Sequence, residues 1–328
     1  MSQRWKRRAI TVSATGVAAL VFYGLLPALL LCSLTLDTIA PKRLARTRGL
    51  LFVGWLLTLE CLGIAAATAN WLYTGGGYAS ETFLRHNMRL QYWWCSTLTA
   101  GLKRLFSVAY EFTGSEHLEA GPLFLFIRHV STADTLLPIT EVALPHAFRT
   151  RYVLKSELQW DPCLDIVGNR LQNAFIRRGQ GASEVESIRK LAQEIDPSTL
   201  IVLYPEGTRF SESRRERRLQ QLRDRSDPKL GLAEQMTHTL PPHVGGPLAL
   251  LEEQPHVDVV FFAHAGLEGI RTVADLFNGT LIGRSVKGHF WRVSAKDIPK
   301  ESTQQQLWLF EQWLQVDEWV GKHPPSAK

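Results

Sequence analysis

Cysteine is scarce in this sequence, and the few cysteines follow no recognisable pattern. The 328 residues include four, with no C-x-x-C pair and no spacing that predicts a metal site. His238, His243 and His264 also lack the spacing of zinc ligands. We therefore expect four reduced, structural cysteines, a state that a cytosolic face favours. A disulfide scaffold, a dithiol redox protein and a zinc protein are all disfavoured.

Charge is nearly absent from two long stretches near the N-terminus. Residues 9–36 are almost uncharged, and residues 50–73 carry only Glu60. As helices, both are long enough to cross a hydrocarbon core of about 30 Å. The first run is too long for a cleaved signal peptide, and a second hydrophobic run follows it. We expect an integral protein of the inner or plasma membrane, with its folded domain on the cytoplasmic face.

The topology of these stretches has two interpretations. Basic clusters lie on both sides of the first stretch, so the positive-inside rule fails for one of them if that stretch spans the bilayer. A shallow hairpin would keep both clusters at one surface, and Gly24 with Pro27 could bend the helix to allow it. Span and hairpin both stay open.

The net charge of +6 is unevenly distributed. Residues 1–73 hold eight basic and two acidic residues, which accounts for the whole excess and leaves the rest of the chain balanced. A nucleic-acid-binding protein usually carries its basic patch on the folded domain, so no nucleic-acid partner is expected. An excess that flanks apolar segments indicates anionic membrane lipids as partners.

The rest of the chain alternates between strand and helix patterns. We predict strands at 108–113, 122–128, 150–154, 173–177, 199–204, 257–263 and 289–294, and helices at 132–143, 182–195, 212–225 and 303–320. Residues 81–106 form an amphipathic helix, either interfacial or a plain packing helix. The predicted fold is α/β, a mixed and mostly parallel sheet flanked by helices, with an N-terminal two-helix membrane anchor. The expected domains are 1–80, 81–107 and 108–322.

A short string follows the buried strand run 122–127. His129-Val-Ser-Thr-Ala-Asp134 offers a base and a carboxylate able to orient it. Positions five apart on one helix point about 140° away from each other, so the two side chains meet only if His129 lies in the turn before the helix. Ser131 or Thr132 is then the helix cap. That geometry would leave one imidazole nitrogen free as a base.

A second string follows the predicted strand 199–204. In Pro205-Glu206-Gly207-Thr208-Arg209, Gly207 permits a tight turn and close backbone approach to a ligand. Arg209 offers a planar fork suited to phosphate. Glu206 would either accept a hydrogen bond from a ligand hydroxyl or brace Arg209. Both strings lie at strand ends, where open α/β sheets place their ligand sites.

These strings, with two blocks between them, resemble the glycerolipid acyltransferases typified by 1-acyl-sn-glycerol-3-phosphate acyltransferase. Lys155-Ser-Glu-Leu158 and Phe175-Ile-Arg-Arg-Gly179 are similar to the family's acceptor-binding block, and the charged stretch after Arg209 resembles a long-insert branch. Two departures stand out. Arg128 occupies a position where the family often has Asn, which puts the identity of the acceptor in question, and no proline follows the valines near Phe262.

The resemblance implies an O-acyltransferase of phospholipid biosynthesis. His129 would be the general base on an acceptor hydroxyl, and Asp134 would fix its tautomer. The acceptor phosphate would lie between Lys155, Arg178 and Arg209, although strand alternation leaves Arg177 open in place of Arg178. Glu206, Gly207 and Thr208 complete the expected substrate-binding set.

The implied substrates are an acyl donor and a lysophospholipid. The donor would be acyl-CoA or acyl carrier protein, and the default acceptor is lysophosphatidic acid, giving phosphatidic acid. No metal or organic cofactor is expected. Reacylation of a different lysolipid and a catalytically inactive lipid-binding protein are the alternatives. A hydrolase would use the same histidine on water, but no G-x-S-x-G elbow is present to support a lipase.

The inserted segment after Arg209 is rich in both charges. Its six arginines are mixed with acids at helical spacing, which is typical of a solvated helix face. The functional interpretation is a surface for the anionic membrane or for the phosphates of an acyl carrier. No aromatic platform is interleaved with these arginines, which disfavours a nucleic-acid site.

Overall fold

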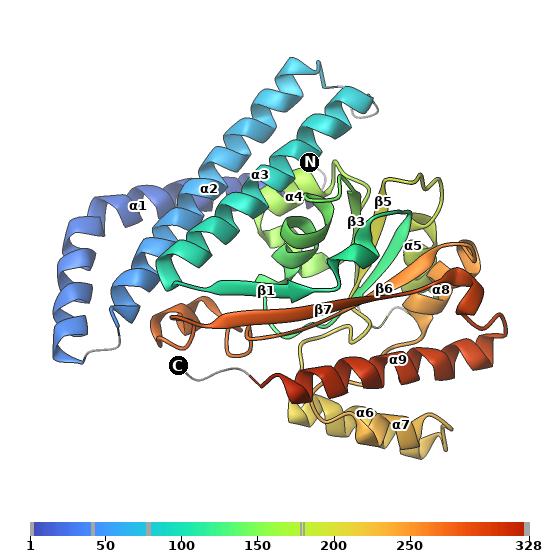
Figure 1. Cartoon of the computed structure of the whole chain (residues 1–328). Coiled ribbons are helices and arrows are strands. Elements are labelled where there is room, and N and C mark those ends of the chain that lie inside the picture. The colour runs from blue at the N-terminus through green and yellow to red at the C-terminus, as the bar shows by residue number, and fades with distance from the viewer. Residues whose placement is uncertain (1–2, 41–42, 77–79, 178, 180, 325–328) are drawn as a thin grey trace. The chain divides into compact units, whose positions relative to one another are not determined.

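Two compact units make up the chain. The computed structural model describes residues 3–40, 43–76, 80–177, 179 and 181–324 (Figure 1). The first unit comprises residues 1–109, 154–175 and 269–284, and the second comprises 110–153, 176–268 and 285–328. Each unit consists of separate stretches of the chain, because residues 154–175 and 269–284 group with the N-terminal helices.

The first unit is helical. Its long helices are α1 (Gln3–Ile39), α2 (Ala45–Tyr73) and α3 (Glu81–Phe106). Three short elements from later in the chain complete the unit: η4 (Ser156–Trp160), α4 (Pro162–Gly168) and η5 (Val273–Phe277). Within the described residues, α1 and α2 are long and apolar enough to cross a membrane. Only 6% of the most apolar window of α1 is buried, against 39% in α2, because α2 packs against α3, α4 and η5. Helix α1 contains Pro27 and bends along its length (Figure 1).

Two arginines at the start of α1 are fixed by one carboxylate of α4. Asp165, fully buried, accepts from Arg7 Nη2 at 2.8 Å and from Arg8 Nε at 3.0 Å. Arg8 Nη2 also donates to the Asp165 carbonyl at 2.8 Å. Part of the basic cluster that we predicted to face lipid headgroups therefore neutralises a buried acid of the same unit.

The second basic cluster is also tied to the protein. Asp37 accepts from the backbone N–H and hydroxyl of Thr47, both at 2.9 Å, and from Arg46 Nη1 at 3.3 Å. Arg48 donates to the Leu105 carbonyl at 2.5 Å. These contacts fix the start of α2 against the end of α3.

Helix α3 has the bounds predicted from the sequence, and one of its faces is a packing face. Phe83, Leu98 and Phe106 are buried, and Phe106 meets Phe52 of α2 edge to face with ring centroids 5.6 Å apart. On another face Trp93 remains 40% exposed.

The sheet has seven strands in the order β1-β7-β6-β2-β5-β3-β4. The strands are β1 (Ala109–Thr113), β2 (Leu123–Ile127), β3 (Arg149–Lys155), β4 (Ala174–Ile176), β5 (Thr199–Leu203), β6 (Asp258–Ala265) and β7 (Ser285–Val293). Strand β2 pairs in parallel with both β5 and β6, and β5 pairs in parallel with β3. Strand β7 pairs with β6 in the antiparallel direction. This mixed, mostly parallel sheet with flanking helices is the predicted fold class.

The central strands form the core of the second unit. Every residue of β2 and β5 is buried, as is all of β6 except Asp258. Apolar runs of this kind need cover on both faces, which helices supply in α/β proteins. Because β6, β2 and β5 are parallel neighbours, their carboxyl ends meet at one edge of the sheet. The two motif strings follow β2 and β5 at that edge.

The remaining helices and turns of the second unit surround this sheet. They are η1 (Ser115–Leu118), η2 (Ala133–Leu136), η3 (Pro138–Ala143), α5 (Ala182–Leu191), α6 (Glu212–Asp224), α7 (Leu230–Gln235), α8 (Gly245–Glu253), η6 (Ala295–Asp297) and α9 (Ser302–Lys322). Three predictions need correction. The helix expected at 132–143 is a 3-10 turn followed by a π-helix, α5 stops four residues short of 195, and β7 begins four residues before 289.

Candidate functional site

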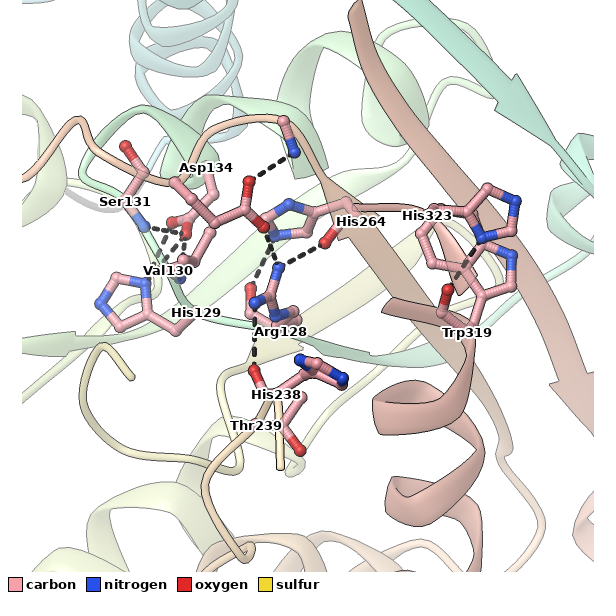
Figure 2. Close-up of polar contacts among 12 residues, drawn as sticks. Arg128, His129, Val130, Ser131, Asp134, His238, Thr239, His264, Trp319 and His323 are labelled. Atoms are coloured by element: carbon pink, nitrogen blue, oxygen red, sulfur yellow. Dashed lines mark hydrogen bonds and ion pairs between the residues drawn. The ribbon is translucent and has the colours of Figure 1, made fainter. Parts of the chain in front are cut away.

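The turn after β2 brings His129 and Asp134 together. His129 Nδ1 lies 3.0 Å from Asp134 Oδ1, and Asp134 Oδ2 accepts the N–H groups of Val130 and Ser131 at 2.7 Å each (Figure 2). One carboxylate thus closes the turn and receives the imidazole, which reaches back from the turn as predicted. Ser131 does not cap an α-helix, because its Oγ accepts from Ala133 N–H within the turn at 3.0 Å.

Asp134 is held as an ionised acceptor. Its burial is complete and opposes ionisation, but the charge and hydrogen bond of His129, with the Ser131 N–H, outweigh burial and lower the pKa of the carboxyl. A carboxylate has no proton to donate, so Nδ1 of His129 is the donor in this pair. That tautomer leaves the lone pair on Nε2, and 18% of the His129 side chain is exposed.

Tyr204 lies against the imidazole, a contact that the sequence reasoning did not assign. The two ring centroids are 4.8 Å apart, and the Tyr204 hydroxyl donates to the Asp134 carbonyl at 3.4 Å. Burial and the Asp134 charge raise the pKa of this phenol well above its usual value. Tyr204 therefore stays neutral and restricts the orientation of the ring.

Glu206 connects the two motif strings through the backbone. Its Oε1 accepts from His129 N–H at 2.9 Å, and its Oε2 accepts from Leu240 N–H at 3.0 Å. The side chain is fully buried, and burial raises the pKa of the carboxyl despite the nearby charge of Arg128. Glu206 therefore braces the backbone of His129, and its contact with a substrate stays a prediction.

The segment 237–240 is fixed in turn by the C-terminal helix. Asp317 of α9, 3% exposed, accepts three successive backbone N–H groups, from Thr237 at 3.0 Å and from His238 and Thr239 at 2.7 Å each. The Thr239 hydroxyl adds a fourth bond at 2.9 Å. Because Leu240 is the next residue, α9 sets the position from which Leu240 reaches Glu206.

Arg128 points into the protein and joins three segments. Its guanidinium donates to the carbonyls of His264 at 2.8 Å and His238 at 3.1 Å, and pairs with Glu268 at 2.5 Å (Figure 2). Burial lowers the pKa of His264, and Nε2 of this neutral ring donates to the Arg128 carbonyl at 2.9 Å. Arg128 is only 3% exposed, so the departure from the family's Asn is a packing feature of this chain.

The loop after β5 has a tight, supported backbone. Gly207 has φ +61°, and a Cβ there would lie 2.9 Å from His243 Cδ2, so both conformation and space require glycine. Its N–H donates to the Tyr204 carbonyl at 2.8 Å and closes the turn. Arg218 of α6 also supports the loop: its guanidinium donates to the Glu206 carbonyl at 2.7 Å and to the Pro241 carbonyl.

The remaining predicted site residues lie in different parts of the structure. Arg209 Nη1 donates to Thr132 Oγ1 at 3.3 Å, which sets its guanidinium beside the His129 turn, and Thr208 is half-buried in the loop. Lys155 ends β3, belongs to the first unit and pairs with Glu157 at 3.0 Å. Arg178 lies outside the described residues. No group of three metal-ligating side chains occurs in the part of the chain that the structure describes.

Removal of the Asp317 carboxylate tests this bracing. Asp317→Ala removes the acceptor of the Thr237, His238 and Thr239 N–H groups, the last of them buried, and we expect the free energy of unfolding to fall by about 2 kcal/mol. Denaturant titration in detergent measures the loss. Glu318→Ala, an exposed change on the same helix, is the matched control. Equal stability of the two variants would contradict the bracing role.

One segment of this chain matches a known protein family. Residues 109–245 match the family Acyltransferase. The crystal structure of the 1-acyl-sn-glycerophosphate (LPA) acyltransferase PlsC from Thermotoga maritima is similar to this chain at 18% identity and a TM-score of 0.46, over 83% of this chain and 98% of that one. The matched segment contains both motif strings, each at the carboxyl end of a central strand. Residues 109–245 therefore form an acyltransferase domain.

Proposed function

We propose that this acyltransferase moves a fatty acyl group from acyl-CoA or acyl carrier protein to the free hydroxyl of a lysophospholipid. The proposed acceptor is 1-acyl-sn-glycerol-3-phosphate, and the product is phosphatidic acid. The observation that carries the proposal is the His129–Asp134 pair at 3.0 Å, which leaves Nε2 as a base. The acceptor supplies the nucleophilic hydroxyl, so the pair needs no serine.

The chemistry follows from that arrangement. Nε2 of His129 takes the proton of the acceptor hydroxyl as its oxygen bonds to the thioester carbonyl carbon. The tetrahedral adduct collapses, the C–S bond breaks, and the thiolate leaves with the proton that the imidazole carried. Asp134 stabilises the transient imidazolium through Nδ1. Glu206 contributes by holding the His129 backbone, and it remains part of the proposed substrate-binding set.

Arg209 is the proposed anchor for the acceptor phosphate. A guanidinium fork binds phosphate through two parallel hydrogen bonds, and Arg209 lies beside Thr132 in the His129 turn. Lys155 and Arg178 remain proposed partners, with Gly207 and Thr208 shaping the loop. Since Arg128 is buried in its own network, it gives no reason to prefer a different lysolipid.

A transfer assay tests the proposed reaction. Detergent-extracted protein is given radiolabelled acyl-CoA and a panel of lysolipids, with His129→Ala beside the unchanged protein. We expect a diacyl product from lysophosphatidic acid and a loss of at least about a hundredfold in the variant, since general-base catalysis contributes that much. His256→Ala, an exposed histidine elsewhere, is the control.

Other results would change the assignment in definite ways. Product from a different lysolipid alone would keep the mechanism and replace the acceptor. Free fatty acid without diacyl lipid would indicate a hydrolase. No product with acyl-CoA or acyl carrier protein would support an inactive lipid-binding protein, and full activity of His129→Ala would exclude the base.

Loss of the Arg209 fork tests the phosphate anchor. Arg209→Ala is expected to raise the KM for lysophosphatidic acid about tenfold, because a hydrogen bond between charged groups is lost. The KM for acyl-CoA should stay unchanged. Lys296→Ala serves as the control for an exposed positive charge. An unchanged acceptor profile would make Arg209 structural.

For the N-terminal part, we propose a membrane-inserted hairpin over residues 1–80, an interfacial helix over 81–107 and a cytoplasmic catalytic domain over 108–322. The sparse burial of α1 leaves it for lipid to cover. One end of α1 is tied to Asp165, between strands β3 and β4. Near its other end, Asp37 accepts from Arg46 at the start of α2, and Arg48 of α2 donates to the Leu105 carbonyl at the end of α3. Both ends of α1 are thus held by elements of the first unit, which supports a hairpin over a span.

Cysteine labelling distinguishes hairpin from span. Single cysteines at Lys6 and Thr38, in a background without the four native ones, are exposed to a membrane-impermeant maleimide in oriented vesicles. A hairpin labels both from the side that also labels a cysteine at Lys296. Labelling of Lys6 and Thr38 from opposite sides would establish a span.

A further inference from the structure

The imidazole of His243 lies against the loop after β5, although no motif of the sequence includes this residue. The backbone N–H of His243 donates to the Pro205 carbonyl at 2.9 Å. A Cβ on Gly207 would lie 2.9 Å from Cδ2 and 3.4 Å from Nε2 of the imidazole. The ring therefore occupies the space that a side chain at position 207 would take.

Arg218 fixes the orientation of this ring. Its Nη2 donates to His243 Nε2 at 2.7 Å and to the Glu206 carbonyl at 2.7 Å, and its Nη1 donates to the Pro241 carbonyl. A guanidinium has donors only, so Nε2 is the acceptor and the proton of the neutral ring lies on Nδ1. Because the lone pair of Nε2 is used by Arg218, His243 is not a second general base.

The other end of the loop is held by different contacts. Phe210 N–H donates to the His129 carbonyl at 3.4 Å, and Arg214 Nη1 donates to the Arg209 carbonyl at 2.9 Å. Between the two held ends lies Gly207, with φ +61°. Glycine has the widest choice of backbone conformations, so the loop is most easily deformed at this residue. The imidazole of His243 covers that point.

We propose that His243 is a positioning residue for this loop and keeps Arg209 in the arrangement that binds the acceptor phosphate. This inference rests on the proposed function. Arg218 holds the imidazole over Gly207, and the ring restricts the glycine. His243 itself touches no substrate and acts through the backbone.

This role has a definite kinetic signature. When a loop spends only a fraction of its time in the binding conformation, the apparent affinity falls by that fraction. A bound acceptor has already selected the correct conformation, so the chemical step is unchanged. Loss of the contact with Arg218 should therefore raise the KM for the acceptor and leave kcat as it is.

Two amide substitutions separate the hydrogen bond from the bulk of the side chain. The amide of glutamine reaches as far along the side chain as Nε2 of histidine, whereas that of asparagine reaches only as far as Nδ1. His243→Gln can therefore accept from Arg218, and His243→Asn cannot. The matched control is His256→Asn, at an exposed histidine before β6. All variants are assayed as full-length protein in detergent.

We expect His243→Asn to raise the KM for lysophosphatidic acid about fivefold, the effect of one lost hydrogen bond. Its kcat and its KM for acyl-CoA should stay unchanged, and His243→Gln and the control should behave like the unchanged protein. Equal acceptor KM values for the Gln and Asn variants, or a fall in kcat at constant KM, would overturn the proposal.

A second background tests whether the effect passes through Arg218. In Arg218→Ala the donor to Nε2 is gone, so a further His243→Asn change should leave the acceptor KM as it is. Additive effects of the two changes would overturn the role, because they would mean that the ring acts by packing alone.

The tautomer of His243 gives a readout that needs no turnover. The nitrogen-15 resonances that disappear in His243→Asn should show a protonated Nδ1 and an unprotonated Nε2, and a proton on Nε2 would overturn the proposal. Activity of the unchanged protein with lysophosphatidic acid tests the proposed function separately. Its absence would overturn both, whereas activity with equal KM values for all variants would overturn only the role of His243.

Discussion

The buried carboxylate of Glu206 is the contact on which the site geometry depends. It accepts the N–H of His129 with one oxygen and the N–H of Leu240 with the other, at 2.9 and 3.0 Å. The His129 carbonyl in turn accepts from Phe210 N–H. Residues of the loop after β5 therefore bond to both the N–H and the carbonyl of His129. Loss of this carboxylate would leave two interior N–H groups without acceptors. The free-energy cost of such an unsatisfied group exceeds the net stabilisation that one hydrogen bond gives to the folded protein. A loop, a strand end and the insert are thereby held in one arrangement.

Two buried carboxylates near His129 have opposite electrostatic environments. Asp134 receives an imidazole and two backbone N–H groups, and its pKa is lowered. Glu206 receives two backbone N–H groups but no direct cation, and burial raises its pKa. The first is suited to stabilising positive charge on the ring, and the second to fixing backbone. Their hydrogen-bond partners distinguish the two carboxylates: Asp134 accepts from the imidazole of His129, and Glu206 accepts from the backbone of the same residue.

The sequence predicts those parts of the protein whose causes are local. The buried runs of β2 and β5, the bounds of α3 and the meeting of His129 with Asp134 all follow from periodicity and helix geometry over short distances. The α-helix expected at 132–143 was wrong, because Asp134 captures the N–H groups of Val130 and Ser131 and tightens the turn. The role of Glu206 needs partners 77 and 34 residues away, and that of Asp317 needs a partner 78 residues away. No local pattern encodes such contacts.

The tautomer of His129 is the most direct measurement of the proposed mechanism. The nitrogen-15 NMR spectrum of histidine-labelled protein in detergent, compared with that of His129→Ala, identifies the resonances of this ring. We predict a protonated Nδ1 and an unprotonated Nε2, because Nδ1 donates to Asp134 and Nε2 must accept the hydroxyl proton. An unprotonated Nδ1 with a proton on Nε2 would mean that Asp134 does not orient the ring, and that His129 has no free lone pair with which to act as the base.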